Sequence, residues 1–388
     1  MTEDLTETQR SILALTEKVC AAFGDDYWLV RDRDGIFPHD FHRAIADSGL
    51  LGVAMPEAYG GSGLGIVEAG LMMRAIAESG AGMAGASSVH MNIFGLQPVV
   101  AFGTEAQKAR MLPPLIRGAE KACFAVTEPD AGLDTAAIAT KADRHGDCYV
   151  VRGQKIWIST AQVADRVLLL ARTAPIEQGQ KRTRGLSLFY TALDRSKVDI
   201  RPIDKMGRHA VDSNVLYFDD LIVPVEDRIG PEGEGFRVVL AGMNPERILI
   251  ACEAVGLGMA AIRRASNYAR ERVVFGRPIG QNQGIAHPLA RSWMELEAAG
   301  GMAMRAAALF DAGRECGTEA NAAKFLAAEA AFTACDTAVR VHGGMGYAAD
   351  YHVERYLRES YIPRLAPVSA EMIANFIAEK VLGLPRSY

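Results

Sequence analysis

The sequence lacks the patterns that mark membrane-spanning and nucleic-acid-binding proteins. No apolar run reaches the roughly 18 residues that a membrane-spanning helix needs. The 42 basic and 47 acidic residues give a net charge of -5 and form no long run of one sign. Such a balanced surface predicts neither a nucleic acid nor a membrane as a partner.

Cysteine is sparse as well. The six cysteines lie far apart and include no Cys-x-x-Cys pair, which argues against a disulfide framework and a zinc-type cluster. We expect reduced, mostly buried thiols and no metal site. The first ten residues are polar and partly acidic, unlike a secretory signal or an Arg-rich transit peptide, so the sequence predicts a cytoplasmic protein.

The chain is long enough for two or three domains, since 388 residues with 49% hydrophobic side chains can bury large cores. From residue 5 to about 118, apolar residues recur at three- and four-residue spacings, as in 12–23, 41–49 and 67–78, which predicts helices. After Pro231 the helical pattern returns in long Ala-, Leu- and Met-rich stretches typical of a helix bundle.

The middle of the chain has a different pattern. Short β-prone runs are separated by turn residues, which is typical of an antiparallel sandwich or barrel. These runs are 122–127, 148–152, 166–171, 186–190, 198–203 and 215–218. We therefore expect a mainly α protein with a central β domain, divided into a helical domain at 1–120, the β domain at 121–230 and a helical bundle at 231–388.

Glycine groups at 60–61, 256–258 and 343–346 do not follow predicted strands. A Rossmann or P-loop nucleotide site needs its glycines between a strand and a helix, so the context excludes both. The segment 56–65 contains too many turn-forming residues for a helix interior and is either a linker or a ligand loop.

Two segments carry the most specific chemistry. The first, Phe124-Ala-Val-Thr-Glu-Pro-Asp-Ala-Gly-Leu-Asp134, is a strand that breaks into a loop shaped by proline and glycine. The second, Lys155-Ile-Trp-Ile-Ser-Thr160, places Trp157 and Ser159 two positions apart on one face of a strand. Taken alone, Trp157 would be interpreted as a core residue. In combination with the other motifs, a cofactor contact is the better interpretation.

The other motifs are Met206-Gly-Arg208, Phe218-Asp-Asp220, Glu271-Arg-Val-Val-Phe-Gly276 and Val341-His-Gly-Gly-Met-Gly-Tyr347. In order and spacing, the whole set resembles the acyl-CoA dehydrogenase family over nearly the entire chain. The resemblance implies a helical domain, a β-barrel or sandwich and a C-terminal four-helix bundle, with non-covalent FAD at their junction. It also implies an acyl-CoA substrate, an electron-transfer flavoprotein as electron acceptor, and a homo-oligomer, either a dimer or a tetramer.

The resemblance assigns roles to single residues. Phe124, Val126 and Thr127 match positions that contact the isoalloxazine ring. Trp157 matches the residue that packs beside the flavin, and Ser159 matches the hydroxyl near its N5. A donor beside N5 stabilises the reduced flavin that forms when N5 accepts hydride. The further positions matched to the cofactor are Gly132, Arg272, Phe275, Gln283, Gly344, Ser369 and Glu371.

Arg272 matches the residue that meets the FAD pyrophosphate, a role that suits a planar, permanently charged guanidinium. Outside the motif, Arg272 would be interpreted as a solvated helix charge, since arginine is common in this stretch. Phe275, Gln283 and Gly344 match FAD positions that the family usually reaches across a subunit boundary.

Dehydrogenation of an acyl thioester removes the α-proton while hydride leaves the β-carbon, so a carboxylate base is required. Many family members carry this glutamate in a Glu-Gly-Thr-like segment near the C-terminus, where this chain has Ala366-Pro-Val-Ser369. A minority pattern, which includes isovaleryl- and long-chain-type enzymes, places the glutamate on a helix directly before an arginine. Met243-Asn-Pro-Glu-Arg-Ile248 matches this pattern, so Glu246 is the candidate catalytic base.

Glu246 is expected near the start of a helix, with Asn244 as a cap and Pro245 in the first turn. The positive helix end would lower the pKa of Glu246 and burial would raise it, and the sequence leaves open which effect prevails. It also leaves open an ordinary first-turn glutamate stabilised by the helix dipole. Glu371 is a weaker candidate base.

Pro367 removes an expected hydrogen bond. It occupies the position of the usual catalytic glutamate, whose backbone N–H helps to polarise the thioester carbonyl, and proline has no N–H. Losing one such donor lowers a rate by on the order of 100-fold or more. Either the N–H of Val368 takes its place, the substrate is polarised differently, or the protein no longer performs standard dehydrogenation.

Leu133 replaces a serine that often contacts the CoA chain in the family. Substrate contacts are then expected elsewhere, from Asn244 and from basic residues such as Arg208, while Arg247 anchors the region. The cofactor pocket is therefore more completely matched than the substrate pocket.

The leading hypothesis is FAD-dependent α,β-dehydrogenation of an acyl-CoA to the 2-enoyl-CoA, in which Glu246 takes the proton and flavin N5 the hydride. An oxygen-using oxidase or monooxygenase of the same fold would tolerate the loss of the usual glutamate. A non-catalytic, FAD-containing acyl-binding protein is the third alternative.

Overall fold

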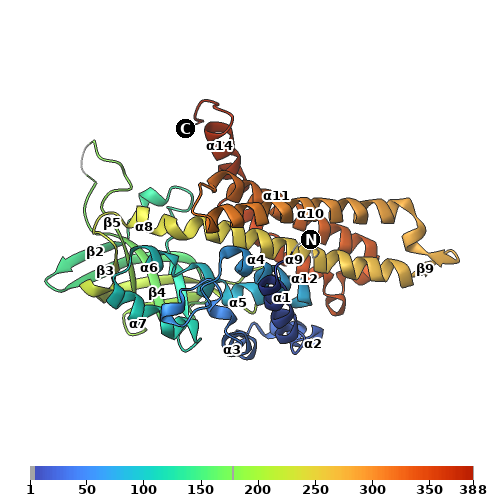
Figure 1. Cartoon of the computed structure of the whole chain (residues 1–388), viewed down its shortest axis with the longest axis horizontal. Helices are drawn as coiled ribbons and strands as arrows, with labels where there is room; N and C mark the ends of the chain where they lie inside the picture. Colours follow the sequence, from blue (N-terminus) through green and yellow to red (C-terminus); the bar gives the residue numbers. More distant parts are fainter. Residues whose placement is uncertain (1–4, 177–178, 388) are drawn as a thin grey trace.

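Two groups of helices flank an eight-stranded sheet in chain order in the computed structural model, which describes residues 5–176 and 179–387. The sheet occupies one end of the molecule and the long helices of the C-terminal part extend away from it, with the N-terminal helices packed alongside (Figure 1). This arrangement confirms the predicted mainly α fold with a central β domain.

The N-terminal helices are α1 (Glu7–Cys20), α2 (Asp25–Asp34), α3 (His39–Asp47), α4 (Ile66–Ile76), α5 (Gly82–Phe94), α6 (Gln97–Phe102) and α7 (Glu105–Ile116). The strands are β1 (Ala122–Ala125), β2 (Lys141–His145), β3 (Cys148–Ser159), β4 (Arg166–Arg172), β5 (Leu186–Ala192), β6 (Val198–Pro202), β7 (Ser213–Pro224) and β8 (Arg228–Ile229). The C-terminal part contains α8 (Gly235–Val239), α9 (Met243–Glu271), the hairpin β9 (Val273–Val274) and β10 (Arg277–Pro278), α10 (Gln283–Asp311), α11 (Gly317–His342), α12 (Val353–Glu359), α13 (Ile362–Leu365) and α14 (Ala370–Lys380).

The strand order of the sheet is β6-β7-β3-β2-β4-β5-β8, and β1 pairs in parallel with β4. All six predicted runs contain strands, but the sequence did not predict β2 or β8. Only Ala142 of β2 is buried, so this strand has almost no apolar pattern. Strand β8 has only two residues, which is too short for an alternation of apolar and polar residues to be detected.

Strand β4 shows how the sheet joins the helices. Leu168 and Leu170 belong to the core formed by the helices, whereas Val167 and Leu169 belong to a second core within the β domain. Alternate side chains of a strand point to opposite faces, so both faces of β4 are covered. The two groups of helices, in contrast, share one continuous core.

Helix α9 runs through the centre of this shared core, and small residues let its neighbours approach. A Cβ added at Gly256 would lie 2.3 Å from the carbonyl oxygen of Arg74 in α4, and one at Gly258 would lie 2.5 Å from Leu296 in α10. The glycines at 256 and 258 therefore serve helix packing. Five of the six cysteines are buried, as predicted, and all six are free.

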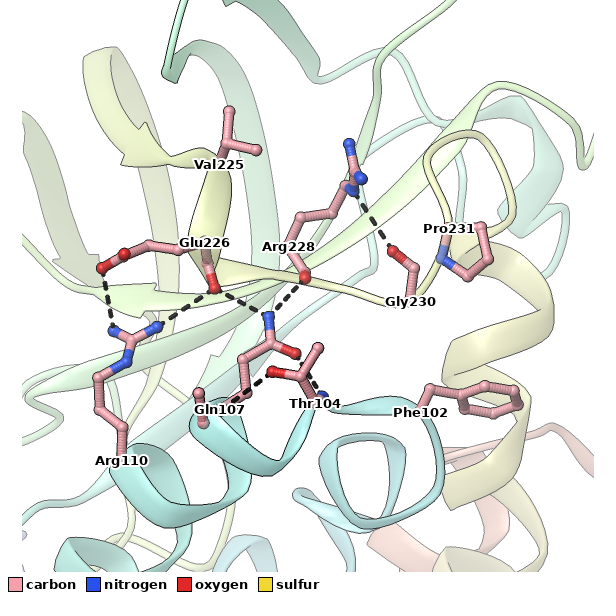
Figure 2. Close-up of a pocket in the computed structure, with 10 residues that line it drawn as sticks. Phe102, Thr104, Gln107, Arg110, Val225, Glu226, Arg228, Gly230 and Pro231 are labelled. Atoms are coloured by element: carbon pink, nitrogen blue, oxygen red, sulfur yellow. Dashed lines mark hydrogen bonds and ion pairs between the residues drawn. The ribbon is translucent and has the colours of Figure 1, made fainter.

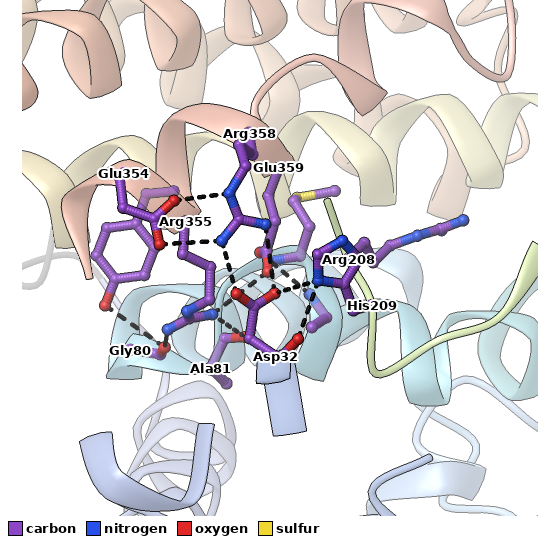
Figure 3. Close-up of polar contacts among 12 residues, drawn as sticks. Asp32, Gly80, Ala81, Arg208, His209, Glu354, Arg355, Arg358 and Glu359 are labelled. Carbon is purple, nitrogen blue, oxygen red and sulfur yellow. Dashed lines mark hydrogen bonds and ion pairs between the residues drawn. The ribbon is translucent and has the colours of Figure 1, made fainter. Parts of the chain in front are cut away.

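A buried ion pair fixes the junction between α4 and α5 (Figure 3). The side chains of Arg355 and Glu359 in α12 are 1% and 0% exposed and lie 3.3 Å apart. Arg355 donates to the carbonyl of Gly80 at 2.6 Å, where φ is 109°. Glu359 accepts from the backbone N–H groups of Met83 at 2.7 Å and Ala84 at 3.3 Å, which satisfies donors at the start of α5.

A second cluster on α12 holds the loop between β6 and β7 (Figure 3). Arg358 pairs with Asp32 of α2 and with Glu354, both at 2.6 Å, and donates to the carbonyl of Met206 at 3.0 Å. His209 in the same loop lies 3.2 Å from the carboxylate of Asp32. Helix α12 thus fixes α5 and the 206–209 segment together.

In the described part of the chain, no helix is both long enough and apolar enough to cross a membrane.

Replacing Gly256 by alanine should destabilise the protein, because the new Cβ would stand 2.3 Å from a backbone oxygen of α4. Urea unfolding should show a loss of about 1–3 kcal/mol. The control is Gly301→Ala in α10, where a Cβ meets no atom within 4 Å and stability should stay equal or rise by up to about 1 kcal/mol. Equal losses at both sites would contradict the packing account.

Candidate active site

The loop after β1 is tied to β3 by a buried charge pair. The Lys155 ammonium donates to the carbonyl of Val126 at 2.8 Å and to Glu128 at 2.9 Å. Glu128 in turn accepts from the backbone N–H groups of Ala139 and Thr140. Burial lowers the pKa of Lys155 to about 8, although Glu128 opposes this shift. The segment that contains Phe124, Val126 and Thr127 is therefore held beside β3.

Trp157 lies in a bulge of β3, which interrupts the alternation that was expected to place Trp157 and Ser159 on one face of the strand. Its φ is 63°, and the pairing with β7 shifts register between Lys155 and Ile158. The extra residue of the bulge re-aims the side chains, because it interrupts the alternation of the strand. Trp157 is 56% exposed while Ile158 is buried. An exposed indole on a constrained backbone suits a platform for a flat ring better than a core position.

Arg208 joins the β domain to α5. Its guanidinium donates to the hydroxyl of Ser159 at 2.9 Å and to that of Ser87 at 3.1 Å. Its Nε is buried and has no hydrogen-bond partner among the described residues. Arg208 is therefore directed into the protein, towards Ser159 and Ser87.

Glu246 lies in the first turn of α9, as predicted, but Asn244 is not its cap. The helix begins at Met243 after the N-cap residue Gly242, and a 3-10 turn at Leu240–Gly242 links it to α8. The α9 terminus is therefore not a free helix end. Asn244 lies inside the first turn, where its side-chain oxygen accepts a hydrogen bond from Arg247 at 3.2 Å.

Burial decides the charge state of Glu246. It raises the pKa of this carboxyl to about 7, although His90 and Arg247 act to lower it. The carboxylate oxygen Oε2 is buried and has no hydrogen-bond partner in the described chain. Of the two opposing effects left open by the sequence, burial prevails.

A histidine on α5 faces the same region of α9. The Nδ1 of His90 lies 2.5 Å from Oε1 of Glu253, which is two helical turns after Glu246. The His90 ring packs against Phe94 with centroids 4.7 Å apart, and Phe94 packs against Phe124 at 5.7 Å. These contacts connect the acidic face of α9 to the β1 segment.

His90 and Glu253 were not predicted from the sequence. Glu253 is an isolated charged residue within the apolar helical run 248–258, and that signal would have identified it as a buried group in need of a partner. His90 has Ser88 and Asn92 close by and carries no such signal. Their separation of 163 positions left their pairing undetectable from spacing.

The C-terminal segment approaches this region through Lys324 of α11. Lys324 donates to the carbonyl of Val368 at 2.5 Å, and its charge acts on both Glu246 and Glu371. Ser369 caps α14 by accepting from the N–H of Met372 at 3.3 Å. The backbone N–H of Glu371 and the hydroxyl of Ser369 lower the pKa of the Glu371 carboxyl.

The remaining predicted cofactor residues do not join this group within one chain. Arg272, Phe275 and Gln283 lie around the β9–β10 hairpin, at the far end of the long helices from the sheet (Figure 1). Tyr268 stacks on His342 at 4.4 Å, which places the segment of Gly344 at the same end. The 29 residues of α9 separate the two ends by roughly 40 Å.

These distant residues are open to solvent. The side chain of Phe275 is 101% exposed, and Arg272, Gln283 and Gly344 are exposed as well. Gly132 and Leu133 also lie on the surface, in the loop after β1, where Leu133 is 60% exposed.

A surface pocket of about 530 Å³ lies elsewhere, between α7 and β8 (Figure 2). Gln107 donates to the carbonyls of Glu226 and Arg228, both at 2.8 Å, and Arg110 pairs with Asp227 at 2.7 Å. These bonds join the N-terminal helices to the β domain, and the pocket contains none of the predicted site residues. Among the described residues, no group of three His, Cys, Asp or Glu side chains is placed to hold a metal ion.

The sequence matches three domain families in chain order. These are "Acyl-CoA dehydrogenase, N-terminal domain" at residues 3–119, "Acyl-CoA dehydrogenase, middle domain" at 123–221 and "Acyl-CoA dehydrogenase, C-terminal domain" at 233–382. The chain is also 36% identical to the acyl-CoA dehydrogenase FadE12 of Mycobacterium tuberculosis over 388 residues, which covers 99% of this chain and 98% of that protein.

Two solved structures are similar throughout. Butyryl-CoA dehydrogenase from Megasphaera elsdenii superposes with a TM-score of 0.93 at 29% identity, over 98% of this chain and 100% of its own. The glutaryl-coenzyme A dehydrogenase in complex with glutaryl-CoA superposes with a TM-score of 0.94 at 30% identity, over 100% of this chain and 98% of its own.

Replacing Lys155 by methionine should loosen the 124–128 segment, because Glu128 would keep a buried charge without its partner. Unfolding should show a loss of about 3–5 kcal/mol. The control is Arg152→Met on the same strand, which removes an exposed ion pair with Asp220 and should change stability little. A small loss at Lys155 would contradict its role as the anchor of this segment.

Proposed function

Because the chain belongs to the acyl-CoA dehydrogenase family, we propose that it oxidises an acyl-CoA thioester to the 2-enoyl-CoA with Glu246 as the base. The observation that carries this proposal is the half-buried Glu246 side chain. Its Oε2 is buried without a hydrogen-bond partner among the described residues, and burial raises the pKa of the carboxyl to about 7. A base with a pKa near neutrality combines the correct charge state with a useful affinity for the proton.

The reaction needs one group that accepts a proton and another that accepts a hydride. Glu246 takes the proton from the α-carbon, and the β-carbon gives up a hydride, so that two electrons and both hydrogens are accounted for. FAD, the proposed cofactor, supplies the hydride acceptor at its N5. The acyl chain would then lie between the β-domain residues Trp157 and Ser159 on one side and Glu246 on the other.

The residues of the β domain fit a flavin ring. Trp157 offers an exposed indole face, and Thr127 lies beside it because the Ile156 N–H donates to the Thr127 carbonyl at 2.9 Å. Arg208 donates to the oxygen of Ser159, which leaves the Ser159 hydrogen free to donate towards N5. We assign Arg208 the role of orienting this hydroxyl.

A second copy of the chain is proposed to complete the cofactor site. Arg272, Phe275, Gln283 and Gly344 are exposed and lie far from Trp157 in their own chain. An exposed phenylalanine beside an arginine suits contacts with another subunit's FAD, as the family resemblance implies. We therefore propose a homo-oligomer, a dimer or a tetramer, with an electron-transfer flavoprotein as electron acceptor.

The thioester carbonyl needs a donor other than residue 367, because proline has no N–H. We propose that the N–H of Val368 replaces it. Lys324 supports this role, because its bond to the Val368 carbonyl holds the segment near Glu246.

Glu246→Gln should abolish the anaerobic bleaching of the flavin by acyl-CoA, because the amide cannot accept the α-proton. The rate should fall by about 10²–10⁴-fold in stopped-flow absorbance. The control is Glu105→Gln on α7, an exposed carboxylate paired with Lys108, which should bleach like the parent protein. Undiminished bleaching in Glu246→Gln, or flavin reduction that requires oxygen, would contradict the proposal.

The rate should also depend on pH. The base acts only when it is unprotonated, so kcat/KM should rise with pH through about 7 and then level off. The charged groups that face Glu246 are His90 on α5, Arg247 and Glu253 on α9, and Lys324 on α11. A profile that is flat between pH 5.5 and about 8, or a rise that persists in Glu246→Gln, would rule out this carboxyl as the titrating group.

A further inference from the structure

Five buried polar atoms in one region have no hydrogen-bond partner among the described residues. They are Oε2 of Glu246, Nε of Arg247, Oε2 of Glu253, Nε2 of His90 and Nε of Arg208. Buried polar groups are normally paired, since an unpaired group costs about 1–3 kcal/mol. Five of them together indicate a site built to contact a polar ligand.

His90 and Glu253 form the distal part of this group. The side chain of Glu253 is 0% exposed and that of His90 is 13% exposed. Burial alone would lower the pKa of His90. The charge of Glu253 and its hydrogen bond to the ring raise this pKa by more, so the pKa of His90 lies above its usual value. A protonated His90 donates from both ring nitrogens, and Glu253 occupies only the one at Nδ1. The N–H at Nε2 therefore remains available.

His90 and Glu253 lie where the distal end of the proposed acyl chain would be. Glu253 lies seven residues after Glu246 on the same face of α9, about 10 Å further along the helix. His90 approaches from α5, next to Phe94 and one helical turn after Ser87, the partner of Arg208. A chain whose α-carbon is at Glu246 and which extends along α9 would bring its distal carbons to His90.

We propose that His90 and Glu253 recognise the distal end of the acyl group, and that the preferred substrate is an acyl-CoA with an oxygen acceptor beyond its β-carbon. This inference rests on the proposed function, which places the α-carbon at Glu246. A hydroxyl or a carboxylate supplies the required acceptor for the His90 N–H. An alkyl chain of the same length would leave that donor buried and unpaired, and sites of this kind discriminate strongly against such analogues.

Binding to the FAD-loaded Glu246→Gln protein tests the inference without turnover. The probes are pentanoyl-CoA, 5-hydroxypentanoyl-CoA and glutaryl-CoA, which share five acyl carbons and differ in the distal group. Shifts in flavin absorbance should give a Kd at least ~10-fold lower for one or both oxygen-bearing probes than for pentanoyl-CoA. The two oxygen-bearing arms separate a hydroxyl from a carboxylate.

Variants in the same Glu246→Gln background test whether His90 and Glu253 cause the preference for the oxygen-bearing probes. His90→Phe should reduce the ratio of Kd values to about one, whereas His90→Gln retains an N–H and should keep part of it. Glu253→Gln should weaken the preference, because His90 loses the charge that favours its protonated form. The control is His42→Phe, a buried histidine of α3 that packs on Phe37 and should leave the ratio unchanged.

Two failures are distinguishable. If pentanoyl-CoA bleaches the parent enzyme but binds as tightly as both oxygen-bearing probes, the recognition site is wrong and the proposed function stands. If no probe bleaches the parent enzyme while the binding preference depends on His90, dehydrogenation is wrong and the recognition site stands.

Discussion

The salt bridge between Arg355 and Glu359 is the interaction on which the candidate site depends. It lies in the core between α12 and the start of α5, where Glu359 satisfies the first free N–H groups of α5. Its neighbour Arg358 holds the loop that carries Arg208. Breaking a buried pair leaves an uncompensated charge, so the geometry of α5 and of this loop is strongly determined. Two elements far apart in the sequence thereby present Ser87, His90 and Arg208 to α9.

Burial shifts the pKa values of the acidic and basic groups of the site in opposite directions. It raises the pKa of Glu246 towards neutrality and lowers that of Lys155, so each is shifted towards its uncharged form. Lys155 has a close carboxylate partner and serves as an anchor, whereas Glu246 keeps an unpartnered oxygen. Proteins retain such unsatisfied groups mainly where function requires them. The unpartnered oxygen of Glu246, together with its pKa near neutrality, therefore suits a proton acceptor.

Much of the architecture followed from the sequence, because periodicity reports which face of each element is buried. The helices and the six apolar strands were predicted in this way, whereas the place of Glu246 in a first helical turn came from the family resemblance and from Pro245. Strand β2 was missed because four of its five residues are polar, and the bulge at Trp157 because a single extra residue does not alter composition. The pairing of His90 with Glu253 requires the folded chain, since only packing brings α5 and α9 together.

The most direct test of the account is a crystal structure of the FAD-loaded protein with a non-oxidisable 3-thia-acyl-CoA. If Glu246 is the base, the α-carbon of the ligand should lie about 3–3.5 Å from the Glu246 carboxylate, with the flavin beside Trp157 and Ser159 on its other side. An α-carbon that faces Glu371 or the 366–369 segment, with Glu246 out of reach, would contradict the relocated base.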